Sequence, residues 1–321
     1  MKKIKKIGVL TSGGDAPGMN AAIRAVVRTA LYFDIEVMGI RFGYKGLMEG
    51  DMVPLAMRSV SGIIQRGGTM LHTARSAEFA TPEGIKKAIG VAEENGLDGL
   101  VVIGGDGSFR GAKALSEDGL PTIGVPATID NDIGCTDYSI GFDTACNIAV
   151  EAIDRLRDTS ESLNRCSVVE VMGHRAGYLA LEVGAASGAL AVLAPEFTCD
   201  LMPEVYDTII KHQKTQYIVV VSEGCSTPSA EVARLIEENT GMSTRLTVLG
   251  HIQRGGAPSA LDRVNATRLG FRAVDLLRKG IGNRVVGIQS DKLVDYDIQE
   301  ALDMQKSIEK ELYMIARIVS L

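Results

Sequence analysis

Tryptophan is absent from this chain of 321 residues, and aromatic residues of all kinds make up only 5% of it. No apolar run approaches the roughly 20 residues that a helix needs to cross a bilayer. An excess of positive charge is missing too, because the formal net charge is −6. A membrane-spanning protein is therefore excluded, and so is a nucleic-acid-binding protein that relies on a basic surface.

Cysteines are few and show no metal-binding spacing. The five of them are odd in number and contain no Cys-x-x-Cys pair: Cys135, Cys146, Cys166, Cys199 and Cys225. This pattern argues against a disulfide framework and against a structural zinc site. The basic residues at positions 2–6 lead directly into a short strand rather than into the apolar core of a signal peptide. We therefore expect a reduced, cytoplasmic protein.

Glycine is abundant, at 36 residues, and 45% of the chain is hydrophobic. Short apolar runs that end in glycine or polar residues alternate with stretches whose apolar residues recur at helical spacing. Strands alternating with helices are typical of an α/β fold with largely parallel sheets. The length and the hydrophobic content are enough for two such domains.

The central stretch, residues 99–132, predicts a strand, a helix and a second strand. Apolar runs at 100–103 and 122–125 are the strands, and residues 111–119 are the expected helix. A right-handed crossover would bring the loops after both strands to one edge of the sheet. Asp106 would then lie in a glycine-rich loop near Thr128, Asp130 and Asp132. Such a set suits phosphate, a divalent metal and a proton-abstracting base.

A second glycine turn, containing Gly13 and Gly14, follows the apolar run at residues 7–10 and opens a helix. Backbone N–H groups at the start of a helix favour phosphate. The alternative, a tight turn with no ligand, stays open. The helix carries Arg24 and Arg28 four residues apart, and a later helix is expected to end near Arg155 and Arg157.

Polar residues in the second half cluster near predicted strand ends. Glu223, His251 and Arg254 follow strands, whereas Arg165 precedes one and Arg245 opens another. Each arginine alone fits ordinary surface charge, but the set favours phosphate recognition, because a guanidinium pairs bidentately with phosphate oxygens. Glu223 in this company fits an acceptor for a polyol hydroxyl.

Taken together, these motifs resemble the bacterial ATP-dependent 6-phosphofructokinases over essentially the whole chain. The matching segments are TSGGDAPGMNAAIR at 11–24, GGTMLHTAR at 67–75, VVIGGDGS at 101–108, TIDND at 128–132, EAIDRLRDT at 151–159, VEVMG at 169–173 and LGHIQRGGAPSALDR at 249–263. GGDG alone also occurs in other kinases. GGDGS followed by TIDND and then by GHIQRGG is highly specific.

The resemblance implies transfer of the ATP γ-phosphoryl group to the 1-hydroxyl of fructose 6-phosphate, with Mg²⁺. It implies a catalytic group made of Asp130 as the base, Thr128, and Asp132 as an assisting carboxylate. The nucleotide-binding positions are matched by Gly14, Arg75, Ser76, Gly105, Asp106, Gly107 and Ser108, with Asp106 supporting the metal. The sugar-phosphate positions are matched by Thr128, Ile129, Asp130, Met172, Gly173, His174, Glu223, His251 and Arg254, and by Arg165 and Arg245, which the family supplies from a neighbouring subunit.

The implied architecture is two Rossmann-like, three-layer α/β/α domains with the active site in the cleft between them. Residues 1–141 with about 254–304 would bind the nucleotide. Residues 142–253 with 305–321 would bind the sugar phosphate. The family forms homotetramers, so we expect sites shared between subunits, with no nucleic-acid or membrane partner.

The choice of phosphoryl donor and the regulation of the enzyme are the two points on which the sequence leaves alternatives open. Pyrophosphate-dependent relatives carry an aspartate and a lysine where this chain has Gly107 and Ala127, so ATP is the expected donor. His174 replaces a family arginine that faces the transferred phosphate, which leaves a regulatory, weakly active paralogue as an alternative. Arg24, Arg28 and Arg157 match effector-site arginines. Leu190, however, replaces a carboxylate there, and the loop 211–216 is shortened, so weak activation by Mg²⁺-ADP is expected.

Overall fold

The computed structural model describes residues 4–198, 200–201, 203–212 and 216–320. The chain forms two compact units. The first contains residues up to Thr128, Ile133–Asp143 and Arg254–Lys306. The second contains Ile129–Asp132, Thr144–Gln253 and the chain from Ser307 onward. Among the described residues, no helix combines the length and hydrophobicity needed to cross a membrane.

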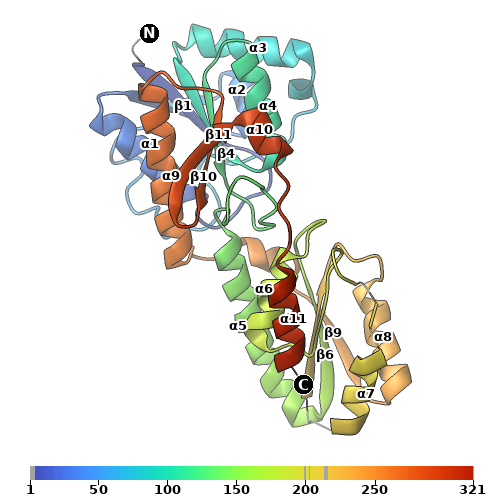
Figure 1. The fold of residues 1–321 in the computed structure, drawn as a ribbon. Coiled ribbons are helices and arrows are strands. Elements are labelled where there is room, and N and C mark those ends of the chain that lie inside the picture. Colours follow the sequence, from blue (N-terminus) through green and yellow to red (C-terminus); the bar gives the residue numbers. More distant parts are fainter. Residues whose placement is uncertain (1–3, 199, 202, 213–215, 321) are drawn as a thin grey trace. The chain divides into compact units, whose positions relative to one another are not determined.

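The first unit is built on a seven-stranded sheet in the order β11-β10-β5-β4-β1-β2-β3 (Figure 1). Its five inner strands are parallel, and the edge strands β3 and β11 run antiparallel to their neighbours. The strands are β1 (Lys6–Thr11), β2 (Glu36–Ile40), β3 (Met52–Pro54), β4 (Gly99–Gly104), β5 (Thr122–Pro126), β10 (Arg284–Gln289) and β11 (Lys292–Asp297). Every residue of β4 is buried, as expected for a parallel strand with helices on both faces.

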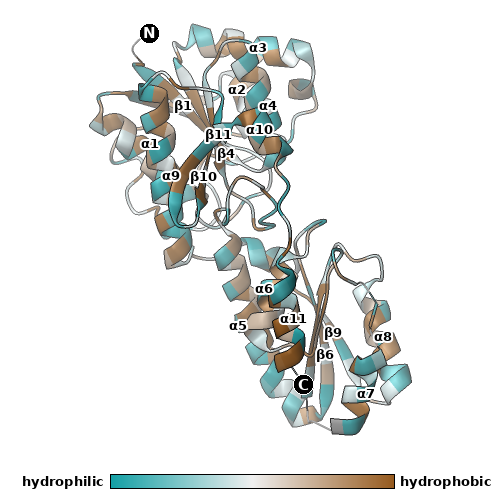
Figure 2. Cartoon of the chain, in the orientation of Figure 1, coloured by the Kyte–Doolittle hydropathy of each residue, from teal (hydrophilic) through white to brown (hydrophobic). Residues whose placement is uncertain are grey.

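Helices cover both faces of this sheet. On one side, α1 (Met19–Tyr32) packs along α9 (Ala260–Arg278). The other side carries α2 (Gly43–Glu49), the short η1 (Glu78–Ala80), α3 (Pro82–Glu94), α4 (Asp106–Glu117) and α10 (Ile298–Asp303). Figure 2 shows the pattern that drives this packing, with hydrophobic strands and helices that are apolar on one face only.

The second unit has a four-stranded, fully parallel sheet in the order β7-β8-β6-β9. Its strands are β6 (Arg165–Val171), β7 (Ala191–Leu193), β8 (Gln216–Ser222) and β9 (Thr244–Val248). In Figure 1, α5 (Phe142–Leu163), α6 (Tyr178–Ser187) and α11 (Lys310–Val319) lie on one side of it. The other side carries α7 (Pro203–His212) and α8 (Ser229–Thr240), and η2 (Gly250–Arg254) follows β9.

The prediction of two α/β domains with largely parallel sheets is confirmed. Two expected helix limits were wrong. Helix α4 begins at Asp106 rather than at residue 111, so the predicted glycine loop is the first turn of a helix. Helix α5 continues to Leu163, past Arg155 and Arg157, and in this last part the buried Ser160 shares a hydrogen bond with Ser167 of β6. The segment Ile129–Asp132, placed with the first domain from sequence, clusters with the second unit.

Candidate active site

The loop after β1 is tied to the end of β4. The backbone N–H of Ser12 donates to the carbonyl oxygen of Ile103 at 2.9 Å. Gly13 adopts a φ of 88°, in the left-handed region that favours glycine. At Gly14, a Cβ atom would collide with the guanidinium of Arg254, which donates to the carbonyl oxygen of Asp15 at 3.1 Å. The glycines therefore let an arginine from the far end of the chain approach this backbone.

The Gly13–Gly14 turn after β1 and the start of α4 together form a candidate phosphate-binding site, which we call the phosphate cradle. Gly105 is the N-cap of α4 and Asp106, half-buried, its first residue. A Cβ placed on Gly107 would meet no atom within 4 Å, so the second position of the helix faces open space. Helix N-termini carry partial positive charge and attract anions. A phosphate group could approach Gly107 without meeting a side chain.

Tyr44 anchors the first turn of α4, a role that the sequence did not reveal. Its hydroxyl donates to the backbone carbonyl of Ser108, and its ring stacks on Phe79 with centroids 4.0 Å apart and an interplanar angle of 4°. Burial raises the pKa of the Tyr44 phenol. The hydroxyl therefore stays protonated and able to donate. The only sequence signal for this role of Tyr44 is an aromatic residue shortly after a predicted strand.

Arg75 and Ser76, the other predicted nucleotide residues, lie in the loop before η1. Arg75 is exposed. The hydroxyl of Ser76 accepts a hydrogen bond from the backbone N–H of Phe79 at 3.2 Å, which fixes the loop locally. Both belong to the same unit as Gly14 and the start of α4.

The strand-end segment after β5 is held by backbone contacts. Ala127 N–H donates to the carbonyl oxygen of Gly104 at 2.9 Å, so Thr128 follows directly beside the start of α4. Ser139 donates from its hydroxyl to the Thr128 carbonyl at 2.6 Å. In the next residues Asp130 is half-buried and Asp132 is exposed.

Ile129, another predicted substrate residue, is fully buried. Asn131 has a φ of 52°, a left-handed conformation that turns the chain between the two aspartates. The segment is therefore a shaped loop rather than an extended tail.

The residues present fit a magnesium ion carried by a nucleotide, and they do not form a cage of their own. No group of three or more histidine, cysteine, aspartate or glutamate side chains able to hold a metal occurs within the described parts of the chain. Mg²⁺ is commonly bound by one or two carboxylates together with substrate phosphates. Asp106, a hard oxygen donor at the start of α4, could supply such a carboxylate.

In the second unit, the loop after β6 is fastened from two sides. Met172 N–H donates to the Oε1 of Gln253 at 2.9 Å. His174 N–H donates to the Oε1 of Glu223 at 2.8 Å. Gly173 (φ 135°) and His174 (φ 54°) both lie in the left-handed region, so this is a sharply turned loop.

Gln253 is the residue that sequence reasoning missed here. Its side chain is 0% exposed, although the GHIQRGG motif contains it. His251, the candidate that the sequence favours in this motif, is exposed and lies in the same short helix, η2. Arg254 at the end of η2 is half-buried and belongs to the first unit.

Arg165 and Arg245 lie at the opposite end of the second sheet from Glu223 and His174. Arg165 is the first residue of β6, and Arg245 pairs in register with Ser167. At about 3.3 Å per residue, Arg165 is about 20 Å from the end of β6. Neither arginine of one chain can thus reach the Glu223 end of its own sheet.

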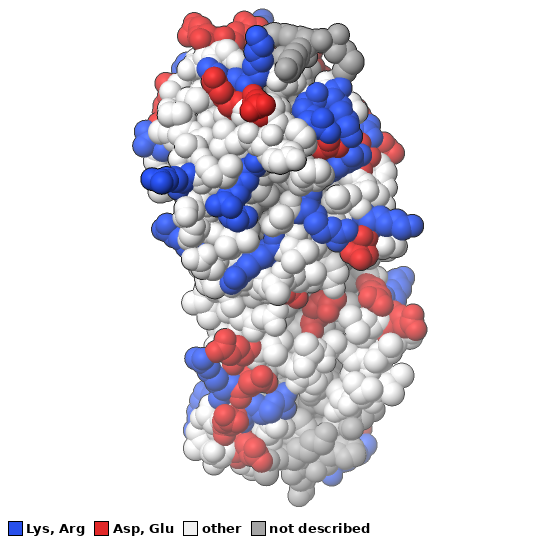
Figure 3. Space-filling model, turned by 90° about the vertical axis from the view of Figure 1, so that its left-hand side faces the viewer, with Lys and Arg blue, Asp and Glu red and all other residues white. Residues whose placement is uncertain are grey.

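The three predicted effector arginines lie in two different units. Arg24 and Arg28 are neighbours on α1, and burial together with the charge of Arg28 lowers the pKa of Arg24. The Arg28 Nε is buried and has no hydrogen-bond partner among the described residues. Figure 3 views the side of the first unit that carries α1 and α9, where basic side chains are spread over the surface. Arg157 on α5 donates to the side chain of Gln216 at 3.1 Å and to the carbonyl of Ser187.

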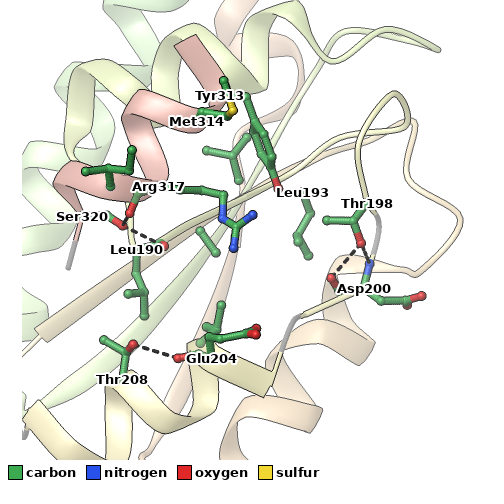
Figure 4. A pocket seen from close by; sticks show the side chains of 14 residues that line it. Leu190, Leu193, Thr198, Asp200, Glu204, Thr208, Tyr313, Met314, Arg317 and Ser320 are labelled. Atoms are coloured by element: carbon green, nitrogen blue, oxygen red, sulfur yellow. Dashed lines mark hydrogen bonds between the residues drawn. The ribbon is translucent and has the colours of Figure 1, made fainter. Parts of the chain in front are cut away.

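Leu190 does not offer a metal ligand. It is 8% exposed and belongs to the hydrophobic core of the second unit. It also lines a largely apolar cavity of about 310 Å³ between β7, α7 and α11, into which Arg317 and Tyr313 project (Figure 4). Part of the loop 211–216, which we expect to be shortened, lies outside the described residues, namely residues 213–215.

Comparison with known proteins places this geometry in a family. The phosphofructokinase family model matches residues 6–277. An ATP-dependent 6-phosphofructokinase of Clostridium tetani is 54% identical over 320 residues, which is 99% of this chain and the whole of the relative. A solved phosphofructokinase of Saccharomyces cerevisiae superposes with a TM-score of 0.89 at 34% identity over 98% of this chain, and this chain spans about half (48%) of the yeast chain.

A pyrophosphate-dependent phosphofructokinase of Marinobacter aquaeolei shares the fold, with a TM-score of 0.86 at 22% identity over 97% of this chain and 88% of its own. At that identity, only the fold is common. The match over most of the chain and the full-length relative at 54% identity leave one conclusion. This chain belongs to the phosphofructokinase family.

Proposed function

We propose that the protein is an ATP-dependent 6-phosphofructokinase of glycolysis. It transfers the γ-phosphoryl group of ATP to the 1-hydroxyl of fructose 6-phosphate and forms fructose 1,6-bisphosphate and ADP. The full-length relative at 54% identity carries this activity in its name. The observation that supports ATP as donor is the open space at Gly107, at the N-terminus of α4.

Both the size and the charge of the space at Gly107 favour ATP. A Cβ added at this position would have no neighbour within 4 Å. Ala127, whose N–H donates to the carbonyl of Gly104, is only 1% exposed. The space can accept the α-phosphate of a nucleotide, and alanine at position 127 offers no ammonium group to bind a pyrophosphate end. The first turn of α4 supplies N–H groups and a dipole to the phosphates. Gly13 and Gly14 supply the second wall.

Phosphoryl transfer needs little covalent help from the protein. The sugar's O1 attacks the γ-phosphorus in line, the bond to the bridging oxygen of the β-phosphate breaks, and the hydroxyl proton passes to a base. Asp130 is that base in this proposal, with Asp132 nearby in sequence and Thr128 positioned by Ser139. Mg²⁺, bound by Asp106 and the ATP phosphates, would neutralise charge on the phosphoryl oxygens.

The sugar phosphate is assigned to the strand-end loops of the second unit. Residues of the loop after β6 are fixed by Gln253 and Glu223. One carboxylate oxygen of Glu223 is engaged by the backbone N–H of His174, which leaves the other oxygen to accept a sugar hydroxyl. Met172, Gly173, His174, Glu223 and His251 form this assigned set, and Arg254 adds a guanidinium for phosphate.

We further propose a homotetramer in the cytoplasm. Arg165 and Arg245 lie too far along the second sheet to join Glu223 in the same chain, so a neighbouring copy must supply them to a shared site. The exposed apolar residues Val248 and Ile252, at and just after the edge strand β9, are consistent with a covered surface there. The four cysteines among the described residues are thiols, which fits a reducing compartment.

A donor-swap assay tests the proposal. Purified protein is given fructose 6-phosphate with MgATP or with Mg-pyrophosphate, and fructose 1,6-bisphosphate is measured through aldolase-coupled NADH oxidation. We expect turnover with MgATP and at least ~10²-fold lower kcat/KM with pyrophosphate, because Ala127 provides no positive charge to bind the end of pyrophosphate. Ligand binding without turnover would instead identify a regulatory paralogue. Turnover with pyrophosphate alone would reverse the donor assignment.

A further inference from the structure

A buried carboxylate at the start of α9 has no part in the chemistry described so far. Asp262 is 2% exposed and lies in the first turn of the helix, where its backbone N–H donates to the hydroxyl of the N-cap residue Ser259 at 3.2 Å. An exposed acidic residue there would already interact favourably with the helix dipole. Burying a carboxylate costs free energy unless hydrogen bonds satisfy it. The burial of Asp262 therefore needs a second explanation.

The buried hydrogen-bond partner of Asp262 comes from a distant part of the chain. Its Oδ1 accepts the backbone N–H of Gly141 at 2.8 Å. Gly141 has a φ of 105°, and a Cβ atom there would lie 2.7 Å from the Cβ of Ala16. Hydrogen bonds to an ionised acceptor are about twice as strong as those between neutral groups. The carboxylate thus fixes a backbone N–H group at a closely packed position.

The two residues before Gly141 connect it to the candidate catalytic segment. Ile140 N–H donates to the carbonyl oxygen of the last residue of β5 at 3.1 Å. The Ser139 hydroxyl donates to the Thr128 carbonyl at 2.6 Å. Ser139 and Ile140 are both buried. Residues 139–141, which we call the bridging segment, therefore have Asp262 at one end and Thr128 at the other.

Asp262 also lies against the turn that belongs to the phosphate cradle. At Gly18, the N-cap of α1, a Cβ atom would lie 2.6 Å from the side chain of Ile140 and 3.6 Å from the Cβ of Asp262. This contact belongs to the side of the first unit where α1 packs along α9 (Figure 1). The end of the glycine turn, the bridging segment and the first turn of α9 thus meet at one buried place within the first unit.

We propose that Asp262 is a positioning residue for phosphoryl transfer. Its carboxylate fixes the bridging segment and, through it, Thr128, from which the chain continues to Asp130. The inference rests on the proposed function, because it assumes that Asp130 is the base. A displacement of about 1 Å caused by a change outside the reacting groups can cost on the order of 10²-fold in rate. Loss of the Asp262 carboxylate should therefore lower kcat more than it changes KM.

Two substitutions at Asp262 test the hydrogen bond to Gly141. Asp262→Ala removes the acceptor, and we expect kcat with fructose 6-phosphate and MgATP to fall about 10- to 100-fold, with both KM values changed by less than about 3-fold. Asp262→Asn keeps an oxygen acceptor, and we expect its kcat to stay within about 3-fold of the wild-type value. Equal losses of kcat in the two variants would overturn the proposal.

Asp275 on the same helix provides a matched control for the loss of a buried carboxylate. It is 5% exposed and accepts hydrogen bonds from Arg278 at 2.9 Å and Lys279 at 2.6 Å. We expect Tm to fall in Asp275→Ala as it does in Asp262→Ala, whereas kcat of the control stays unchanged. If both variants lose kcat to the same extent, the loss reports destabilisation of the helix and the proposal is overturned.

A double-mutant cycle with Asp130 separates positioning from stability. In an Asp130→Ser background the base is already absent, so its misplacement has no further consequence. We expect Asp262→Ala to lower kcat by less than about 3-fold in this background, compared with about 10- to 100-fold in the wild-type background. Equal factors in both backgrounds would show that Asp262 does not act through Asp130 and would overturn the proposal.

Ser139→Ala tests the other end of the bridging segment and does not depend on whether Asp262→Ala folds. It removes the donor to the Thr128 carbonyl, and we expect kcat to fall about 3- to 10-fold, whereas a normal kcat would overturn the proposal. The failure of the proposed function is distinguishable. If the wild-type protein shows no turnover, the proposed function is wrong, and this inference with it. If the wild-type protein turns over and Asp262→Ala has a normal kcat, only the positioning role is wrong.

Discussion

Arg254 lies against the backbone of Gly14, where its Nη1 donates to the neighbouring carbonyl of Asp15 at 3.1 Å. The two residues are far apart in the chain, and both belong to the first unit. One is a candidate for nucleotide binding and the other for sugar-phosphate binding. The missing side chain at Gly14 is what allows the guanidinium to lie there.

Gly14→Ala is expected to displace Arg254 rather than to unfold the protein. The collision involves the end of a flexible side chain, so the guanidinium can move away at small cost in stability. Losing one charge-assisted contact to phosphate costs about 1.5–3 kcal/mol, or about 10- to 150-fold in KM for fructose 6-phosphate. Steady-state kinetics and a melting curve check this. A normal KM with a lowered Tm would show that Gly14 serves the fold alone.

Gly107→Asp is expected to separate stability from donor use. An aspartate at the second position of α4 meets no neighbour and interacts favourably with the helix dipole, so Tm should not fall. The same carboxylate would repel the nucleotide phosphates and lower kcat/KM for MgATP by about 10-fold or more. Gly107→Ala is the matched control, since it adds bulk without charge and removes a helix-destabilising glycine. An aspartate variant with unchanged kcat/KM would refute the electrostatic account.

Asp130→Ser is expected to lower kcat by about 10²-fold or more, with a modest change in KM for the sugar phosphate, because a general base is lost. Asp118→Asn, an exposed carboxylate just after α4, is the control and should be unaffected. Near-normal kcat at saturating substrates would remove Asp130 from the mechanism.

The sequence predicted the parallel strands well because their apolar runs are continuous and end in glycine or polar residues. It did not reveal β3 and β11, whose partly exposed residues lack such a run. The start of α4 was missed for a different reason. Asp106, Gly107 and Ser108 have low helix propensity, and Tyr44 stabilises that turn from a distant segment.

Long-range contacts explain what was missed at the candidate site. Gln253 holds the loop after β6 through a single side-chain acceptor 81 residues away, and nothing in its local sequence indicates this. Residue types and spacing predict the candidates at the strand ends. The long-range hydrogen bonds that hold these candidates in place are visible only in the three-dimensional structure.

Two buried thiols predict loss of stability in alkali. Burial raises the pKa of Cys135 and of Cys166 from 9.0 to about 12 in the folded protein. Between those values the folded state keeps protons that the unfolded chain releases, so stability falls as pH rises above 9. At about pH 10 the loss is about 1.4 kcal/mol per thiol. Urea unfolding from about pH 7 to about pH 10 should show this slope. It should flatten in a Cys135→Ala, Cys166→Ala double variant, and an unchanged slope would contradict the assignment.

Regulation is where we expect this chain to differ most from its family, and Mg²⁺-ADP is expected to activate it weakly or not at all. Mg²⁺ needs hard oxygen ligands, and Leu190 is a buried aliphatic side chain in the hydrophobic core. Glu196 is held away from that task, since its Oε1 accepts the backbone N–H of Gly177 at 2.9 Å and turning toward position 190 would cost this hydrogen bond. Arg24 and Arg28 repel each other, so an anion without metal still gains by binding between them.

We therefore expect the protein to keep inhibition by an anion such as phosphoenolpyruvate even where activation by Mg²⁺-ADP is lost. Saturation curves for fructose 6-phosphate, at fixed ATP with and without millimolar MgADP, measure the activation. A melting curve with inorganic phosphate measures the anion site, and we expect a rise in Tm that Arg28→Ala abolishes. Arg155→Ala, which removes an exposed arginine paired with Glu151 on its own helix, is the control. A large leftward shift with MgADP that Arg24→Ala removes would show that the effector site works without a carboxylate at position 190.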